Sequence, residues 1–414
     1  MATEAGAYVV TAQSAGVVKV PGRGVDVTLL LILSIALIFR IYLAVTVPYI
    51  HDEENNAIPL AKTISFTPGS LHLPLRGENH GALPAYVVKV SSSLFGTTPL
   101  AYRALHIFLG VCTILIVYRI ARDWYGPVAG RWAAMLLAFN EYYLPISARA
   151  TAHAPFLFFV ALALYVFSRF LATERAGYLY AAGAAVGLAF YCKEHATLLL
   201  PAFLLTLLHP KFRHWLRGRH AYLAAGVFVA FIGPDLYWNA TTSTETLVHY
   251  GNQPALQAHY TNHLRRIGGI GFSPYPFMFY GRRAVMPLYK AVTGRALVDE
   301  TAEYSSINPV LGILLLGAVL ATAIFRRERD VLTVFLLLMF ACVFGLFTFI
   351  ARGDPPGRLD PVSWIWVETT IFPAVMLAGA GLAEVGGRAR LVAWMVGGGA
   401  LAYGVVLILS QNAG

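Results

Sequence analysis

The sequence predicts an all-α polytopic integral membrane protein, and three observations carry this prediction. Of the 414 residues, 57% are hydrophobic and only 13% are charged. The mean hydropathy is +0.62, well above that of a soluble domain. The apolar residues also gather in long runs, and about 20 such residues are enough to span the hydrocarbon layer of a bilayer.

About eleven such runs follow one another along the chain. They lie near residues 25–47, 100–118, 127–145, 154–171, 177–192, 196–209, 221–238, 307–325, 331–350, 363–384 and 391–410. The short pair on either side of residues 192–196 could also be one broken helix. The first run is long enough to span, so no cleavable signal sequence is expected.

The runs divide the chain into four parts. Residues 1–24 form an N-terminal tail, and residues 25–240 form a transmembrane module that includes a first external loop at 48–99. Residues 241–306 form a second external loop, and residues 307–414 form the C-terminal transmembrane helices. Loops of this length usually serve function. The segments IPLAKTISF and ALPAYVVKVSSSLF in the first loop, and FMFYGRRAVMPLYKAV in the second, are expected to form amphipathic helices on the membrane surface.

Basic residues in the short connections predict the orientation. If every run spans, all of them fall on one side: Lys19, Arg23, Arg119, Arg122, Arg169, Arg175, Lys211, Arg213, Arg217, Arg219, Arg326, Arg327, Arg329, Arg388 and Arg390. By the positive-inside rule this side is the cytoplasm, so the long loops are external to the cytoplasmic membrane. The net charge of +10 then reflects topology and contact with anionic membrane lipids. No nucleic-acid partner is expected, because the basic groups are dispersed.

Ionisable residues converge on the predicted external face. They lie at the ends of different runs, and the set comprises Asp52, Glu53, Glu54, Glu141, Arg149, His153, Lys193 and Arg358. Ionisable groups near membrane depth are costly, so they usually face a cavity or one another. A mixture of carboxylates and cations suits a phosphate-bearing substrate and a proton-transfer reaction.

Several segments, in register, resemble the GT-C class of membrane glycosyltransferases. The acidic pair Asp52 and Glu53 stands where that class has its first-loop acidic motif. ENHGALPAYVVKV (78–90) resembles the element H/K-P-P-L-x-x-W/L, with Gly81 and Ala82 in place of the prolines. YRALHIFLGVCTILIVYRIARDWYG (102–126) resembles an arginine-led second helix. SARATAHAPFLFF (147–159) resembles S-R-x-x-x-x-D-x-P, and AGAAVGLAFYCKEHATLLLP (182–201) resembles a glycine-rich helix that ends in a lysine and a proline.

The resemblance is to the protein O-mannosyltransferase and aminoarabinose-transferase branch, which is glycosyltransferase family 39-like. It implies a GT-C-like fold and an inverting glycosyltransferase that uses a polyprenyl-phosphate-linked hexose or pentose at the external face. The acceptor would be a lipid, a glycan or a protein.

The resemblance also implies roles for individual residues. Asp52 would be the general base, and Glu53 would orient it or contact the acceptor. Lys193 would bind the lipid phosphate, with Arg149 and Arg358 as further phosphate or donor contacts. His80 would touch the phosphate or sugar, and Glu141 completes the substrate-binding set.

His153 departs from the acidic residue that related enzymes often have there. No cofactor is required by this interpretation, but His153 could ligate a divalent metal ion together with Asp52, or relay a proton.

Two other functions remain open. A transporter or flippase-like carrier of a lipid-linked or anionic substrate would need polar residues through both leaflets, whereas the ionisable groups cluster at one face. A non-catalytic GT-C relative that binds a lipid or a partner would be expected to lack the first-loop acid.

Overall fold

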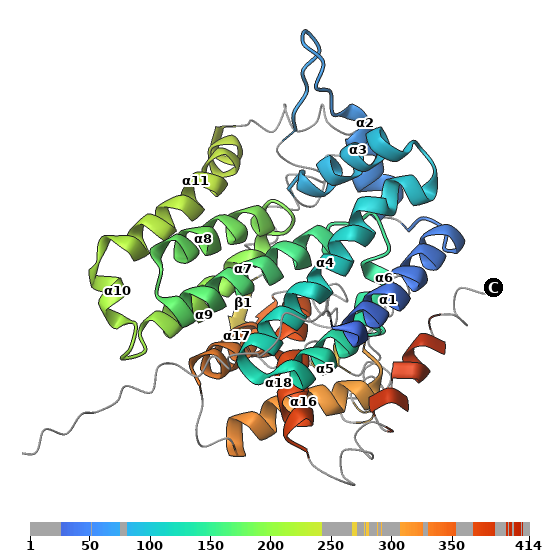
Figure 1. The fold of residues 1–414 in the computed structure, drawn as a ribbon. Coiled ribbons are helices and arrows are strands. Elements are labelled where there is room, and N and C mark those ends of the chain that lie inside the picture. Colours follow the sequence, from blue (N-terminus) through green and yellow to red (C-terminus); the bar gives the residue numbers. More distant parts are fainter. Residues whose placement is uncertain are drawn as a thin grey trace, which may run out of the picture.

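The computed structural model describes residues 26–50, 52–74, 81–241, 267–270, 307–325, 330–352 and 367–385, with isolated positions within 277–291 and 395–408. These residues form a bundle of packed helices (Figure 1). The predicted helical class is confirmed. One small exception is an antiparallel pair of strands, β1 (Ile267–Ile270) and β2 (Ile350–Arg352).

The described helices follow the predicted runs. In residues 26–241 they are α1 (Val27–Thr46), η1 (Glu53–Ala57), α2 (Ile58–Thr63), α3 (Leu83–Phe95), α4 (Pro99–Tyr125), α5 (Pro127–Ala138), α6 (Tyr143–Ile146), α7 (His153–Thr173), α8 (Ala176–Phe190), η2 (Glu194–Leu199), α9 (Leu200–Leu207), α10 (Arg213–Arg217) and α11 (Arg219–Thr241). Further along the chain are α16 (Pro309–Phe325), α17 (Val331–Phe349) and α18 (Ile371–Glu384). The α2 and α3 helices form where surface helices of the first loop were predicted. The segment FMFYGRRAVMPLYKAV of the second loop lies mostly outside the described residues.

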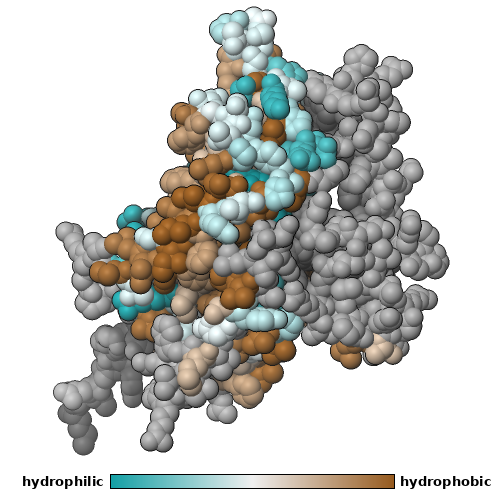
Figure 2. Space-filling model, turned by 90° about the vertical axis from the view of Figure 1, so that its right-hand side faces the viewer, coloured by the Kyte–Doolittle hydropathy of each residue, from teal (hydrophilic) through white to brown (hydrophobic). Residues whose placement is uncertain are grey.

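Within the described residues, five helices are long and apolar enough to cross a membrane: α1, α4, α7, α17 and the segment Val367–Glu384. Shorter apolar helices, among them α8 and α16, occupy other predicted runs. The α1 helix exposes large apolar side chains such as Leu31 and Ile38, at 60% and 65%. Figure 2 shows a hydrophobic area on this side of the molecule, with hydrophilic residues above it. The protein is therefore an integral membrane protein, and the full predicted count of spans extends beyond the described residues.

The α8 and α11 helices pack closely because two glycines of α8 remove side chains from their interface. A Cβ atom at Gly183 would lie 2.5 Å from the carbonyl oxygen of Ala224. A Cβ atom at Gly187 would lie 2.5 Å from Cβ of Phe231. Small residues four positions apart permit such close contact between membrane helices. The glycine pattern in residues 182–188 is thus a helix-packing motif.

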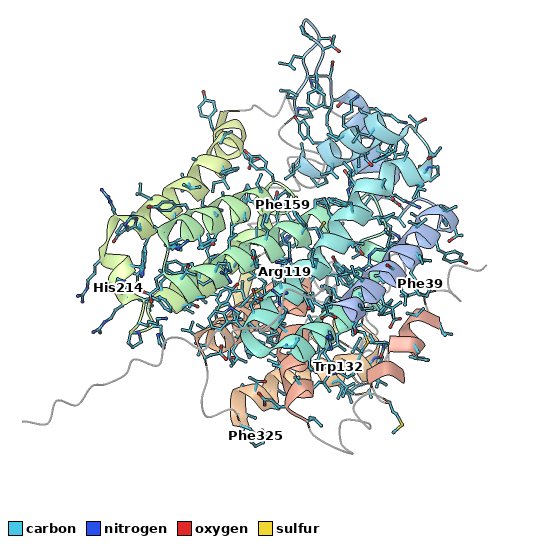
Figure 3. The ribbon with its side chains drawn as sticks, in the orientation of Figure 1. Phe39, Arg119, Trp132, Phe159, His214 and Phe325 are labelled. Atoms are coloured by element: carbon cyan, nitrogen blue, oxygen red, sulfur yellow. The ribbon has the colours of Figure 1, made fainter. Side chains whose placement is uncertain are left out.

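Stacked phenylalanines hold the C-terminal helices against the N-terminal module. The rings of Phe167 in α7 and Phe203 in α9 are parallel, with centroids 4.4 Å apart. Phe335 of α17 packs on both rings, at 4.8 Å and 5.3 Å. Such aromatic contacts bury large apolar areas and fix ring geometry. Side chains fill the spaces between the helices (Figure 3).

The chain breaks and turns back at Lys193. The α8 helix ends at Phe190, Lys193 is extended (φ −154°, ψ 131°), and the 3₁₀ helix η2 leads into α9. After α9, Lys211 Nζ lies 3.4 Å from Glu174 Oε1, next to the start of α8. The two runs around residues 192–196 are therefore two antiparallel elements. A lysine at such a turn can point into the bundle.

Described basic residues of the connections lie at the end of the bundle opposite to Lys193. Arg122 and Arg169 approach Asp123 at 2.8 Å and 3.7 Å. The 21-residue α7 helix, about 30 Å long, separates this end from His153. At the same end Asp26 caps α1 and accepts hydrogen bonds from Tyr118 and Arg131. Burial raises the pKa of Asp26, but these hydrogen bonds outweigh it and leave the pKa below its usual value.

Candidate active site

Four buried side chains from separate segments meet near one end of the bundle, and we call them the Lys193 cluster. Tyr142 precedes α6, His153 begins α7, Lys193 lies at the break after α8, and Glu368 precedes α18. All four residues are at most 3% exposed. Elements far apart in the sequence thus supply one buried polar site.

The carboxylate of Glu368 is the centre of the Lys193 cluster. Lys193 Nζ donates to Glu368 Oε1 at 2.8 Å. The hydroxyl of Tyr142 donates to Glu368 Oε2 at 2.6 Å, and His153 Nδ1 lies 2.7 Å from the same oxygen. Charge-assisted hydrogen bonds of this length are strong when water is excluded.

The His153 ring contacts one hydrogen-bond acceptor and one hydrogen-bond donor through the same nitrogen. Its Nδ1 lies 2.7 Å from Glu368 Oε2 and also 2.7 Å from Lys193 Nζ. A protonated Nδ1 donates to the carboxylate, whereas a bare Nδ1 accepts from the ammonium. Nδ1 can therefore serve only one of these two partners at a time.

A buried ion pair such as Lys193 with Glu368 is weak evidence for stability. Removing two charges from water costs several kcal/mol for each ion, which their attraction repays only with good geometry. In membrane proteins, buried ionisable groups of this kind usually mark functional sites. The Lys193 cluster is therefore a candidate active site.

A second buried ion pair fixes the start of the first loop. Glu53 and Arg103, both 0% exposed, form two hydrogen bonds of 2.7 Å through Nε and Nη2. The backbone nitrogen of Ala150 donates to Glu53 Oε1 at 2.8 Å, and that of Ile50 donates to Oε2 at 3.2 Å. The first loop is thereby tied both to α4 and to the segment before α7.

Arg103 also closes the end of α1. Its Nη1 donates to the carbonyl oxygens of Ala44 and Val47, each at 2.8 Å, and its Nη2 donates to that of Pro48 at 3.1 Å. The last carbonyls of a helix lack partners within the helix, and a cation there is favourable. The guanidinium also lies over the ring of Tyr49, 4.8 Å from its centroid. Burial raises the pKa of the Tyr49 phenol, so this ring stays neutral.

Asp52 is linked to both buried clusters. It is half-buried, precedes η1 and is bonded along the chain to the anchored Glu53. Its charge also interacts electrostatically with His153 of the Lys193 cluster. The described structure thus brings Asp52, His153 and Lys193, three of the predicted site residues, into one region.

The other predicted site residues have varied positions. Glu141 is buried, 5% exposed, directly before Tyr142. Arg149 is half-buried beside Ala150, the residue that donates to Glu53. His80 and Arg358 lie outside the described residues.

Glu368 was missed by the sequence reasoning, although a signal for it exists. It is an acidic residue within the apolar run predicted at 363–384. The rule that an ionisable group in a span faces a partner applies to it as much as to Lys193. Only the fold, however, shows that the two are partners.

The proposed metal ligands Asp52 and His153 receive no support from a wider ligand set. Among the described residues, no group of three or more His, Cys, Asp or Glu side chains could hold a metal ion. The ammonium of Lys193 lies 2.7 Å from His153 Nδ1 and 3.2 Å from Nε2, and a cation at both ring nitrogens does not favour a metal ion there. The metal site stays a prediction, and no chemical step is assigned to it.

Gly81 explains one departure from the family pattern. A Cβ atom at Gly81 would lie 2.2 Å from the carbonyl oxygen of Tyr191, two residues before Lys193. The backbone nitrogen of Leu83 donates to that same oxygen at 3.3 Å. Proline, like every residue except glycine, carries a Cβ atom. The first loop can therefore approach the break before Lys193 this closely only with glycine at position 81.

Replacing Gly81 by alanine should destabilise the protein by about 1–3 kcal/mol, the usual cost of overpacking a closely packed site. The measurement is the thermal unfolding midpoint in detergent micelles. Gly177→Ala is the matched control, because a Cβ atom at Gly177 would have no atom within 4 Å. Equal midpoints for the two variants would contradict the close contact with Tyr191.

Comparisons with known proteins confirm the resemblance found in the sequence. Residues 79–238 match the family model described as dolichyl-phosphate-mannose-protein mannosyltransferase. An uncharacterized protein of Aquifex aeolicus (strain VF5) is 29% identical over 138 residues, which are 32% of this chain and 28% of that protein.

Two solved structures share the fold. The crystal structure of ArnT from Cupriavidus metallidurans bound to undecaprenyl phosphate has a TM-score of 0.62 at 15% identity, and the match covers 90% of this chain and 64% of that one. The oligosaccharyltransferase of Archaeoglobus fulgidus, tethered to an acceptor peptide, has a TM-score of 0.51 at 17% identity, covering 93% and 54%. The chain thus spans less than two thirds of the length of either protein. At these identities the likeness shows the GT-C-like fold.

Proposed function

We propose that this chain is a glycosyltransferase that moves a sugar from a polyprenyl-phosphate-linked donor to an acceptor at the external face of the cytoplasmic membrane. The observation that carries the proposal is the buried Lys193 cluster, whose His153 interacts electrostatically with Asp52, within a fold shared with ArnT. The matched ArnT structure contains undecaprenyl phosphate, and the matched family model is named for a dolichyl-phosphate sugar. Both support a lipid phosphate as the group that carries the donor sugar.

Asp52 is the proposed general base. Its half-buried carboxylate would accept the proton of the acceptor hydroxyl as that oxygen bonds to the anomeric carbon. The bond between the anomeric carbon and the phosphate oxygen breaks in the same displacement, so the configuration inverts. The electron pair of that bond leaves with the polyprenyl phosphate.

Lys193 is the proposed contact for the leaving phosphate. A preorganised cation in a water-excluded site stabilises negative charge far better than a solvated one. Arg149 and Arg358 are proposed as further phosphate or donor contacts, because a guanidinium can hold two oxygens. His80 and Glu141 complete the proposed substrate-binding set.

Glu53 is proposed to act through Asp52. Its carboxylate already accepts hydrogen bonds from Arg103, Ala150 and Ile50 and is 0% exposed. Of the two predicted roles, this arrangement supports orienting the base over contacting the acceptor. His153, which interacts with Asp52 and borders Glu368, is proposed to relay the proton away from the base.

The test is a transfer assay with purified protein in lipid. Radiolabelled polyprenyl-phosphate hexoses and pentoses are supplied together with lipid, glycan and protein acceptors. The wild type should transfer one of the sugars, and Asp52→Asn should lose at least about 100-fold in rate, the lower end of what general-base catalysis supplies. Asp330→Asn, far along the chain at the start of α17, is a matched control. Transfer that survives unchanged in Asp52→Asn would contradict the base, and transfer that survives a chelator would argue against an exchangeable metal ion.

A further inference from the structure

Glu368 occupies one of the positions from which a phosphate oxygen could contact Lys193. The Glu368 Oε1 atom is 2.8 Å from Lys193 Nζ, and both side chains are buried, at 1% and 4% exposed. A lipid phosphate brought to this ammonium would meet the carboxylate at close range. Two negative groups so close, with water excluded, oppose each other strongly. The phosphate and Glu368 would therefore compete for the single positive charge of Lys193.

The two oxygens of Glu368 are held independently. Only Oε1 contacts Lys193, whereas Oε2 accepts from Tyr142 at 2.6 Å and lies 2.7 Å from His153 Nδ1. If Lys193 turned to another anion, the hydrogen bond from Tyr142 to Oε2 would remain. The carboxylate would therefore stay partnered after it had lost the ammonium.

His153 offers a compensating bond. While Nδ1 accepts from Lys193 at 2.7 Å, it cannot donate to Glu368. Once Lys193 has turned away, a hydrogen on Nδ1 can point at Glu368 Oε2 without opposing the ammonium. A buried carboxylate that exchanges one charged partner for a donated hydrogen bond avoids the large cost of an unpaired buried charge.

We propose that Glu368 is an internal competing anion, which holds Lys193 until the phosphate of a lipid-linked ligand displaces it. This inference rests on the proposed function, because it takes Lys193 to be the phosphate contact. No covalent bond forms or breaks in the exchange: Lys193 Nζ leaves Glu368 Oε1 for a phosphate oxygen. Glu368 then lowers the donor affinity by competing for Lys193, and it orients the ammonium before the phosphate binds.

The test measures binding of undecaprenyl phosphate, without a sugar, to purified protein in nanodiscs. Glu368→Gln keeps the shape of the side chain and an oxygen for Lys193 but removes the competing charge. It should bind undecaprenyl phosphate roughly tenfold more tightly than the wild type. Glu384→Gln, the same change at the exposed far end of α18, should leave the affinity unchanged. In a protein that already carries Lys193→Met, Glu368→Gln should not increase the affinity for undecaprenyl phosphate.

If folded Glu368→Gln protein binds undecaprenyl phosphate no more tightly than the wild type does, the inference is overturned. The proposed function would still stand in that case, because the wild type binds the lipid phosphate. No binding by either protein would instead contradict the proposed function. If Glu368→Gln does not fold, Glu368→Asp provides the measurement. The aspartate side chain is shorter and should not reach both Lys193 and Tyr142. The Glu368→Asp protein should therefore bind undecaprenyl phosphate more tightly than the wild type. Binding equal to or weaker than that of the wild type would contradict the competition.

Discussion

Replacing Arg103 by methionine should destabilise the protein by about 3–5 kcal/mol, the cost of leaving one member of a buried ion pair alone. Glu53, 0% exposed, would lose both 2.7 Å hydrogen bonds from the guanidinium. The carbonyl oxygens of Ala44, Val47 and Pro48 would lose their donor at the end of α1. Many domains are stable by only about 5–15 kcal/mol, so this variant should be close to unfolding.

The measurement is the yield of folded protein and its thermal unfolding midpoint in detergent. Arg119→Met is the matched control, because Arg119 lies on the same helix but is exposed (Figure 3). The double variant Arg103→Met with Glu53→Gln should recover part of the loss, since it removes the unpaired charge. If Arg103→Met were as stable as Arg119→Met, the ion pair would not anchor the first loop.

Replacing Lys193 by methionine should reduce sugar transfer by about 100- to 1,000-fold, as loss of a preorganised group that stabilises developing charge does. The side chain keeps its length and apolar stem but no longer offers an ammonium to the leaving phosphate. Lys211→Met is the matched control, because Lys211 forms a partly exposed pair with Glu174 at 3.4 Å. The measurement is the initial rate of transfer at saturating acceptor.

A double variant separates catalysis from folding. Lys193→Met alone leaves the Glu368 carboxylate without its cation, so part of the lost activity could come from lost stability. Lys193→Met with Glu368→Gln removes this charge and should restore the unfolding midpoint without restoring transfer. Recovery of transfer in the double variant would mean that Lys193 only neutralises Glu368, which would contradict phosphate contact.

Much of the fold could be predicted because membrane spans obey simple physical limits. Length and hydropathy alone located α1, α4, α7 and α17 to within a few residues, except for the seven-residue extension of α4 beyond the predicted run at 118. The run near 391–410 and the second external loop extend beyond the described residues. The break between α8 and α9 was harder, because apolar residues flank Lys193 on both sides and two antiparallel elements resemble one interrupted helix.

The candidate site could be predicted only in part, because its partners come from distant segments. Asp52, His153 and Lys193 were identified from their positions at the ends of runs, and the structure brings them into one region. Their partners Glu368 and Tyr142 are 175 and 51 residues from Lys193 in sequence, and spacing gives no information on such contacts. Arg103 is likewise the arginine at the start of the predicted second helix. The sequence did not indicate that it pairs with Glu53, which lies 50 residues earlier.

The most direct test of the proposed function follows the glycosidic bond of the donor. The protein would be reconstituted in liposomes with a polyprenyl-phosphate sugar labelled in both the sugar and the lipid, and the products would be separated after reaction with acceptor. We predict that the bond is cleaved, with one polyprenyl phosphate released for each sugar transferred. Movement of the intact donor from one leaflet to the other, without cleavage and with any acceptor, would contradict the transferase and favour a carrier.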